Sequence, residues 1–340
     1  MNKQVELPLE VPPFSTYHYQ AINGAVIGKN PSIKNWFYNQ MINLRCDRAF
    51  LGGYTTPVFS VVWSDFTDNP HLEIITIPLK YLKGHAHFVI RNLLDDGYYV
   101  AYGGIDDYFV EGKSWYGERH FAHDGLICGY DQGDKTYTIY AYDKNWVCRT
   151  FKTPQEGLEK GWRYMFKEGV FGLLRAVKPK EAYVELNLKT MCGKLREYLD
   201  SSLEKYPPDL ERNPVEKQKR TYGIAVQDYL CLYLDKLLDG TIPHERLDRR
   251  VFRLVWEHKA VMLDRIRTVE KHLILSSEIG DAYAPLVKQA DGIRMMYALY
   301  HAQRRDSLPK TMKKSLQELR AAEEPILRAF VRSIEEAMKK

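Results

Sequence analysis

The sequence predicts an α+β fold for its first part and an all-α helical bundle for its second. Seventeen of the 22 glycines lie in residues 1–180, whereas charged residues number 39 there and 54 in 181–340. Glycine costs about 1 kcal/mol inside a helix relative to alanine, so the glycine-poor, charge-rich part favours helix. In the first part, helical spacings precede alternating apolar patterns, as in helices followed by an antiparallel sheet. We therefore expect domains at 1–178 and 185–340.

Length and composition exclude several classes of protein. The 340 residues exceed the roughly 250–300 at which single cores stop growing, in agreement with two domains. No apolar run approaches the ~18 residues of a membrane span, and the first residues lack the apolar core of a secretory signal. A net charge of +5 is too small to indicate nucleic-acid binding. Five cysteines without a CxxC pair argue against a disulfide framework or zinc cage and favour a cytoplasmic location.

The first part alternates between helical and extended patterns. The expected elements are helices at about 18–27 and 34–44, a strand at 73–79, a helix at 85–97, a strand at 98–104, and hairpin strands at 126–130 and 136–142. The segment HAHFVIRNLLDDG has apolar residues at helical spacing and ends in Gly97, a common helix stop. DQGDK separates the hairpin strands with turn-forming residues.

The second part is predicted to form five to seven amphipathic helices. One face of the segment 251–273 is apolar at spacings of three and four, through Val251, Leu254, Val255, His258, Met262, Ile266, Val269 and Leu273. Another helix ends at Gly240, and Pro243 restarts the chain near a first helical position. The segments 284–305 and 312–338 repeat the amphipathic pattern. These faces predict a helical core rather than a chemical site.

Reactive side chains are densest in the segment GIDDYFVEGKSWYGERHFAHDGLICGYD. Within 19 positions it holds Asp106, Asp107, Tyr108, Tyr116, His120, His123 and Asp124. Because His123 begins one hairpin strand and Asp143 follows the other, we expect the two at the same end of the ladder. A carboxylate beside an imidazole fixes its tautomer and supports the imidazolium that forms when it acts as a base. A structural histidine paired with an acid is the simpler interpretation of the spacing alone.

This block resembles the N-terminal domain of the butirosin biosynthesis protein H family, which has a papain-like cysteine-protease fold. The matching residues are Asp106, Tyr108-Phe109, Tyr116, His120-x-x-His123, Gly129-Tyr130-Asp131 and Asp143. The resemblance is specific over about 85–150, weaker over 14–84, and a helical second domain also occurs in the family. It implies transfer of an acyl group from a carrier-protein or other thioester to an amine in specialised-metabolite biosynthesis, or hydrolysis or cyclisation of such an intermediate.

The resemblance also implies roles for individual residues. His123 is expected as the general base and Asp143 as the group that orients it. Asp106, Tyr108, Tyr116 and His120 are expected to shape the substrate cleft, together with His18 and Tyr19 from the first helix. The helical domain would cover the cleft or dock a carrier protein.

One departure from the family pattern concerns the nucleophile. Members place a cysteine at the N-terminus of the first helix, where the positive helix end lowers its pKa. The matching segment FSTYHYQAINGAVI contains no cysteine, and Thr16 or Tyr19 takes that place, depending on the register. Thr16 or Ser15 could serve with a well-placed base. Cys46 could be supplied from elsewhere in the chain, with Arg45 and Arg48 favouring its thiolate, although an inert buried thiol is the plainer interpretation.

Two other functions stay open at this point. A site without covalent chemistry would make the chain a catalytically inactive binding or scaffold subunit. His120, His123 and Asp124 are metal-ligand types and would suit a metal-dependent hydrolase, but His123 and Asp124 are expected on opposite faces of a regular strand. We expect no cofactor and no metal, a small-molecule or carrier-bound acyl substrate, and no nucleic-acid or membrane partner. A homodimer stays open.

Overall fold

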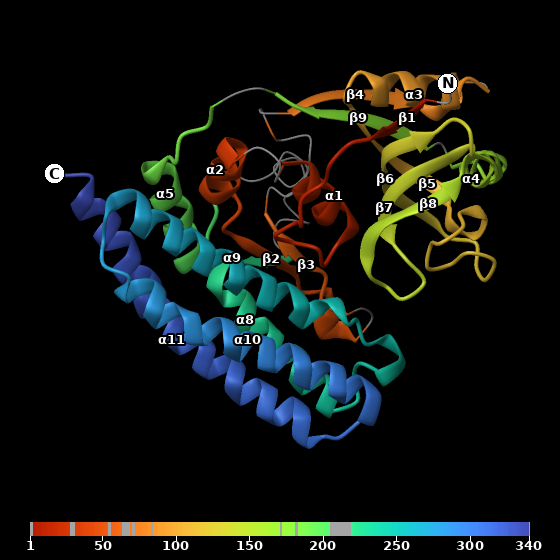
Figure 1. The fold of residues 1–340 in the computed structure, drawn as a ribbon. Coiled ribbons are helices and arrows are strands. Elements are labelled where there is room, and N and C mark those ends of the chain that lie inside the picture. Colours follow the sequence, from red (N-terminus) through yellow and green to blue (C-terminus); the bar gives the residue numbers. More distant parts are fainter. Residues whose placement is uncertain are drawn as a thin grey trace. The chain divides into compact units, whose positions relative to one another are not determined.

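The computed structural model describes residues 3–27, 31–53, 56–62, 69, 72–82, 84–170, 172–180, 183–204 and 219–339. The chain forms two compact units (Figure 1). The first contains Met1–Lys34 and Asp65–Val184, and the second contains Asn35–Ser64 and Glu185–Lys340. The sequence predicts one continuous domain over 1–178, whereas the structure assigns residues 35–64 to the second unit.

The first unit is built on a seven-stranded sheet in which every pairing is antiparallel. Its strand order is β4-β9-β5-β6-β7-β8, and β1 pairs with β6 beside this path. The strands are β1 (Gln4–Glu6), β4 (Leu72–Pro78), β5 (Tyr99–Asp106), β6 (Ala122–Asp131), β7 (Thr136–Tyr142), β8 (Cys148–Pro154) and β9 (Leu173–Pro179). The expected antiparallel sheet is confirmed, and β6 and β7 form the expected hairpin.

Helices pack on this sheet. They are α1 (His18–Ile27), α3 (Ala86–Asp95) and α4 (Gln155–Lys167), with short 3₁₀ turns η3 (Leu79–Tyr81) and η4 (Asp107–Phe109). Ile90 of α3 and Leu158 of α4 join Val100 and Ile139 of the strands in one buried core. The apolar spacing of HAHFVIRNLL therefore forms the helix that the sequence predicts, and its stripe faces the sheet.

A β-bulge interrupts β5 opposite Asp124 of β6. Tyr102 pairs with Gly125 of β6, but the next pair joins Ile105 to His123, so Gly103 and Gly104 oppose one residue of β6. Gly104 has a φ of 73°, a left-handed conformation that glycine adopts without steric cost. Because a bulge re-aims neighbouring side chains, the simple alternation of faces does not hold here.

The second unit is mainly helical. Its helices are α5 (Leu188–Leu199), α8 (Val226–Leu238), α9 (Arg250–Leu273), α10 (Glu278–Gln303) and α11 (Ser307–Ala337), with the 3₁₀ turns η1 (Ala49–Gly52), η5 (Gly223–Ala225) and η6 (His244–Arg246). The helix α2 (Pro31–Gln40) begins in the first unit and ends in the second. Figure 1 shows α9, α10 and α11 side by side, and α10 packs against both of the others. The periodicity of 251–273 is confirmed by α9, whose Val251, Met262 and Ile266 are buried.

The prediction of an all-α second domain is wrong in one respect. Strand β10 (Arg220–Tyr222) pairs with β2 (Leu44–Asp47), which in turn pairs with β3 (Phe59–Val61). This small sheet needs strands from both segments of the second unit. No local pattern near 220 reveals it, because a three-residue strand carries little periodicity.

A buried ion pair lies in the helical core. Lys259 Nζ lies 2.7 Å from Glu323 Oε2, and both side chains are fully buried. Hydroxyls of Tyr198 and Tyr283 donate to the Glu323 carboxylate, and Lys259 donates to Tyr198. These additional bonds satisfy the charges that burial removes from water. Within the described residues, no helix has the length and apolar character needed to cross a membrane.

Candidate functional site

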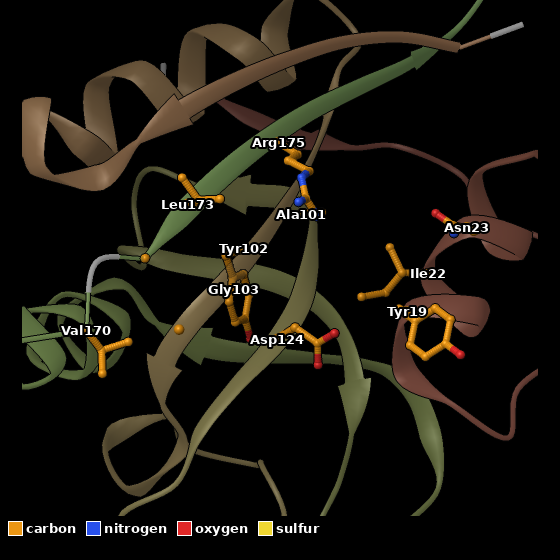
Figure 2. A pocket seen from close by; sticks show the side chains of 12 residues that line it. Tyr19, Ile22, Asn23, Ala101, Tyr102, Gly103, Asp124, Val170, Leu173 and Arg175 are labelled. Carbon is orange, nitrogen blue, oxygen red and sulfur yellow. The ribbon is translucent and has the colours of Figure 1, made fainter. Parts of the chain in front are cut away.

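A cavity of about 420 Å³ lies in the first unit (Figure 2). It is lined by Tyr19, Ile22, Asn23, Ala101, Tyr102, Gly103, Gly104, Asp124, Val170, Gly172, Leu173 and Arg175. Figure 2 shows α1 residues on one side and sheet residues on the other. A concave site of this size, mostly apolar with a few polar groups, is typical of a small-molecule pocket.

His18 links α1 to this cavity through Asp124. His18 opens α1, and its Nδ1 donates a hydrogen bond of 2.6 Å to Asp124 Oδ1. The His18 side chain is buried, and its Nε2 has no hydrogen-bond partner among the described residues. Burial lowers the pKa of His18 more than the Asp124 carboxylate raises it, so the imidazole is neutral at pH 7. In the neutral ring, Nε2 therefore carries a lone pair that accepts no hydrogen bond from the described residues.

Asp124 is held ionised by its neighbours. Burial alone would raise the pKa of this carboxyl, but the His18 hydrogen bond and the nearby His123 and Lys113 outweigh burial and hold the pKa below its usual range. Lys113 Nζ also donates to the backbone carbonyl of Asp124 at 2.7 Å. The cavity therefore has a fixed negative charge in its wall.

His123 is held by a buried Asp107–Lys113 pair. His123 Nδ1 lies 3.2 Å from Asp107 Oδ2 and 3.4 Å from Lys113 Nζ. Lys113 Nζ lies 3.1 Å from Asp107 Oδ1, and both of these side chains are fully buried. The His123 side chain is 23% exposed, which makes it the more accessible of the two site histidines. Asp107 is therefore the carboxylate that orients His123.

The two histidines and Asp124 form one compact cluster. The rings of His18 and His123 have centroids 4.9 Å apart, and His123 Nε2 lies 3.4 Å from Asp124 Oδ1. One ligand atom from each residue falls within 4.8 Å of the other two. The expectation that His123 and Asp124 point to opposite faces is wrong, because β6 runs opposite the Gly103-Gly104 bulge at this point.

The expected partnership of His123 with Asp143 is replaced by another arrangement. Asp143 accepts hydrogen bonds from the backbone of Asn145 and Val147, and Arg149 Nε donates to it at 2.6 Å. These bonds shape the turn between β7 and β8. The buried Asp143 carboxylate therefore stabilises its own turn. Asp107, not Asp143, contacts His123 and takes the orienting role that the sequence assigns to Asp143.

His120 forms a separate cluster around Asp106. His120 Nδ1 donates to Asp106 Oδ2 at 2.6 Å, and its ring stacks between Tyr108 and Tyr164 at centroid distances of 4.4 and 4.3 Å. The fully buried Asp106 also accepts from the backbone of Tyr108 and Phe121. Asp106 therefore caps the chain after β5, and this cluster supports the segment that carries Asp107.

The remaining residues expected from the sequence have different surroundings. Tyr19 lines the cavity and is 39% exposed, as expected of a substrate contact. Tyr116 is 49% exposed and does not line the cavity. Thr16 is 1% exposed, and its carbonyl accepts from the Tyr142 hydroxyl, so its burial argues against attack on a substrate.

Cys46 lies in the second unit, on β2. Its thiol is fully buried, and burial raises its pKa to about 12. Arg45 donates to Ser60 instead, and the buried sulfur contacts the carbonyl of Asp47. Cys46 is therefore an inert structural thiol, and the expected effect of its basic neighbours on the thiolate is absent.

Sequence reasoning did not identify Lys113, which contacts Asp107 and His123, or Arg175, which lines the cavity. Lys113 is a buried cation within a turn, and only its surroundings after folding reveal its partners. Tyr102 also lines the cavity, and its buried hydroxyl has no hydrogen-bond partner among the described residues. Arg175 lies half-buried on β9 and lines the cavity, which no motif near it in the sequence indicates.

Comparisons with known proteins add no functional assignment. A scan of the chain against models of protein families finds no match, and a search of the curated proteins finds no significant relative.

Proposed function

We propose that this protein is an acyl-transfer or acyl-hydrolysing enzyme of papain-like architecture that acts on a small thioester or amide in the cavity of its first unit. The observation that carries the proposal is the convergence of His123 and His18 on Asp124, a residue of the cavity wall. The resemblance to the butirosin biosynthesis protein H family supplies the reaction class.

His123 acts as the general base in this proposal. Its contact with Asp107 presents Nδ1–H to a carboxylate and leaves Nε2 to accept a proton from an amine or water. The amine or water then attacks the acyl carbon, a tetrahedral oxyanion forms, and the thiolate or amine leaves with the returned proton. Asp124 stabilises the imidazolium that exists between the two proton transfers.

Tyr102 donates to the oxyanion in this mechanism. Tyr102 lines the cavity, its buried hydroxyl has no partner among the described residues, and burial raises the pKa of that hydroxyl well above the ordinary value, which keeps the proton on oxygen. A preorganised donor in a water-poor site stabilises developing negative charge strongly.

The acyl group passes directly to the acceptor, without an enzyme-bound acyl intermediate. The resemblance implies a cysteine at the place of Thr16 or Tyr19, where this chain has none, and Thr16 and Cys46 are buried. Direct attack needs only positioning and proton transfer, which together supply large rate factors.

The test uses acyl N-acetylcysteamine thioesters as donors, with water or small primary amines as acceptors. Released thiol is measured with a chromogenic disulfide. We expect the H123Q variant to lower kcat/KM by about 10²–10⁴-fold, the range for a lost general base. The H87Q variant is the matched control, because His87 contacts Tyr137 and Glu159 rather than the cavity. Equal thiol release by wild type and H123Q, or none from wild type, contradicts the proposal.

A metal-dependent hydrolase is the second candidate, and one observation favours it. His18, His123 and Asp124 offer two imidazoles and one carboxylate, a donor set that zinc enzymes use with an open fourth position. Ligands about 2.0–2.1 Å from zinc lie roughly 3.4 Å apart in a tetrahedron, which matches the 3.4 Å between His123 Nε2 and Asp124 Oδ1. The Lys113 ammonium beside His123 opposes this assignment.

Elemental analysis of purified protein separates the two candidates. A hydrolase of this kind holds about one metal per chain, loses it in H123Q and keeps it in H120Q. Full thioester turnover by protein treated with a chelator and shown to be metal-free removes the metal candidate.

A further inference from the structure

Arg175 is a cation in the cavity wall that has no partner among the described residues. Among the twelve lining residues, the charged side chains are Asp124 and Arg175. Asp124 is engaged by His18, whereas Arg175 makes no ion pair or side-chain hydrogen bond with any part of the chain that the structure describes. A guanidinium presents five donors in a rigid fork that matches a carboxylate.

The sheet register aims Arg175 into the cavity. Arg175 pairs with Ala101 on β5, and Ala101 pairs with Leu126 on β6, so the three side chains share one face. The core beneath α3 and α4 uses the other face, through Val100, Leu174 and Ile127. Figure 2 shows Arg175 extending from β9 into the space between the sheet and α1.

Apart from Tyr19, Asn23 and Tyr102, the rest of the wall is apolar, and it leaves room for a ligand. Ile22, Ala101, Val170 and Leu173 provide apolar surface. A Cβ built on Gly103 would meet no atom within 4 Å, which indicates open space at this point of the cavity. One cation and one engaged carboxylate give the wall a balanced charge, which suits a singly charged ligand better than a phosphate dianion.

We propose that Arg175 binds the carboxylate of a small apolar monocarboxylate substrate, whose acyl centre then lies toward Asp124 and His123. This specificity for a substrate with a free carboxylate deepens the proposed function and rests on it for the identity of the reacting group. The binding step itself needs no turnover.

The experiment measures binding to the full chain by ligand-observed NMR and calorimetry. The probes are straight-chain and arylalkyl monocarboxylates, each paired with its primary amide. We expect the carboxylates to bind more tightly than their amides. In R175Q the carboxylate Kd should rise by about tenfold or more, in line with loss of a charge-assisted bidentate contact, while amide binding stays unchanged.

Three further variants make the result specific. R175K keeps the charge but loses the fork, so it should recover part of the affinity. K178Q removes a cation from the same strand, where Lys178 contacts the Asp96 carbonyl, and should leave binding unchanged. G103L should weaken carboxylates and amides alike by filling the cavity. Thermal unfolding of each variant checks that it is folded.

Several outcomes overturn the assignment. These are equal binding of carboxylates and amides, no binding of either series, or unchanged carboxylate affinity in R175Q. H123Q separates this inference from the proposed function, because it should keep carboxylate binding while losing thioester turnover. Intact H123Q turnover with R175Q-sensitive binding would refute the function and leave the carboxylate site standing.

Discussion

His18 and Asp124 meet across 2.6 Å although 106 positions separate them in the chain. The contact joins the first residue of α1 to β6, and Asp124 extends it to the cavity wall and to His123. A helix terminus, a sheet and a pocket are thus connected through one carboxylate. The predictions below test how this arrangement is supported and used.

The buried Asp107–Lys113 pair should couple stability to activity. D107N leaves the fully buried Lys113 ammonium without its counter-charge and should cost about 3–5 kcal/mol in the free energy of unfolding. The double variant D107N/K113M removes both charges and should recover part of that loss, measured by denaturant unfolding. Activity should stay low in both, because His123 has lost its orienting carboxylate. A double variant no more stable than D107N would contradict this interpretation.

Tyr102 should matter for activity rather than for stability. Its buried hydroxyl lacks a partner among the described residues, so Y102F removes an unsatisfied polar group and should leave stability unchanged or slightly higher. Thioester kcat should nevertheless fall by about 10²–10³-fold, the usual loss for an oxyanion donor. Chemical denaturation and steady-state kinetics on one preparation measure both effects. A less stable but fully active Y102F would assign the hydroxyl a structural role.

Gly161 should govern how closely α4 approaches the site. A Cβ there would lie 2.7 Å from Ile105 Cγ2 and 2.9 Å from the carbonyl oxygen of Asp106. G161A should therefore cost about 1–3 kcal/mol and reduce activity by displacing the segment that carries Asp107. Gly193 in α5 is the matched control, since a Cβ there meets nothing within 4 Å. G193A should gain about 0.5–1 kcal/mol, and equal effects of the two substitutions would refute the close-approach argument.

Thiol alkylation should leave the proposed activity intact. Burial raises the pKa of Cys46 and Cys128 to about 12 and that of Cys231 to about 11, so their thiolates are scarce at pH 7. Iodoacetamide should react first at the part-exposed Cys148, with turnover retained within about twofold. Peptide mapping identifies the labelled cysteine. Rapid inactivation that follows labelling of a buried cysteine would indicate covalent catalysis instead.

His258 should make the second unit sensitive to acid. Burial, and then the neighbouring Lys259, lowers its pKa from 6.5 to about 3, whereas the unfolded chain takes up the proton near pH 6.5. Between these values the unfolded state binds one more proton, so stability should fall by about 1.4 kcal/mol per pH unit as the pH decreases. H258Q should flatten the slope of unfolding free energy against pH over this window. An unchanged slope would show that other groups control it.

Local patterns predicted much of the secondary structure. The helix expected at 18–27 is α1, and the periodicity of 251–273 appears as α9, because repeated apolar spacing over several turns determines one buried face. Short strands were not predicted. Strand β10 has only three residues, and it is recognised as a strand only through its pairing with β2.

The site was harder to predict than the fold, because its partners come from turns and a bulge. His123 was found from the sequence, but its carboxylate was expected at Asp143, whose side chain serves its own turn. Asp107 lies in η4 directly after β5, a place where spacing gives no sign of orientation. The approach of Asp124 to His123 depends on the extra residue in β5. The regular alternation of side chains along a strand does not predict such a bulge.

The discontinuous second unit has a consequence for synthesis of the chain. Residues 35–64 leave the ribosome well before residues 185–340, with which they form a unit. Strands β2 and β3 are therefore synthesised before β10, and they lack this pairing partner while most of the first unit is translated. A fragment that stops near residue 180 would retain these strands as an exposed edge, ready to pair with another chain. Chaperone demand and aggregation should accordingly peak in nascent chains that end between the two segments.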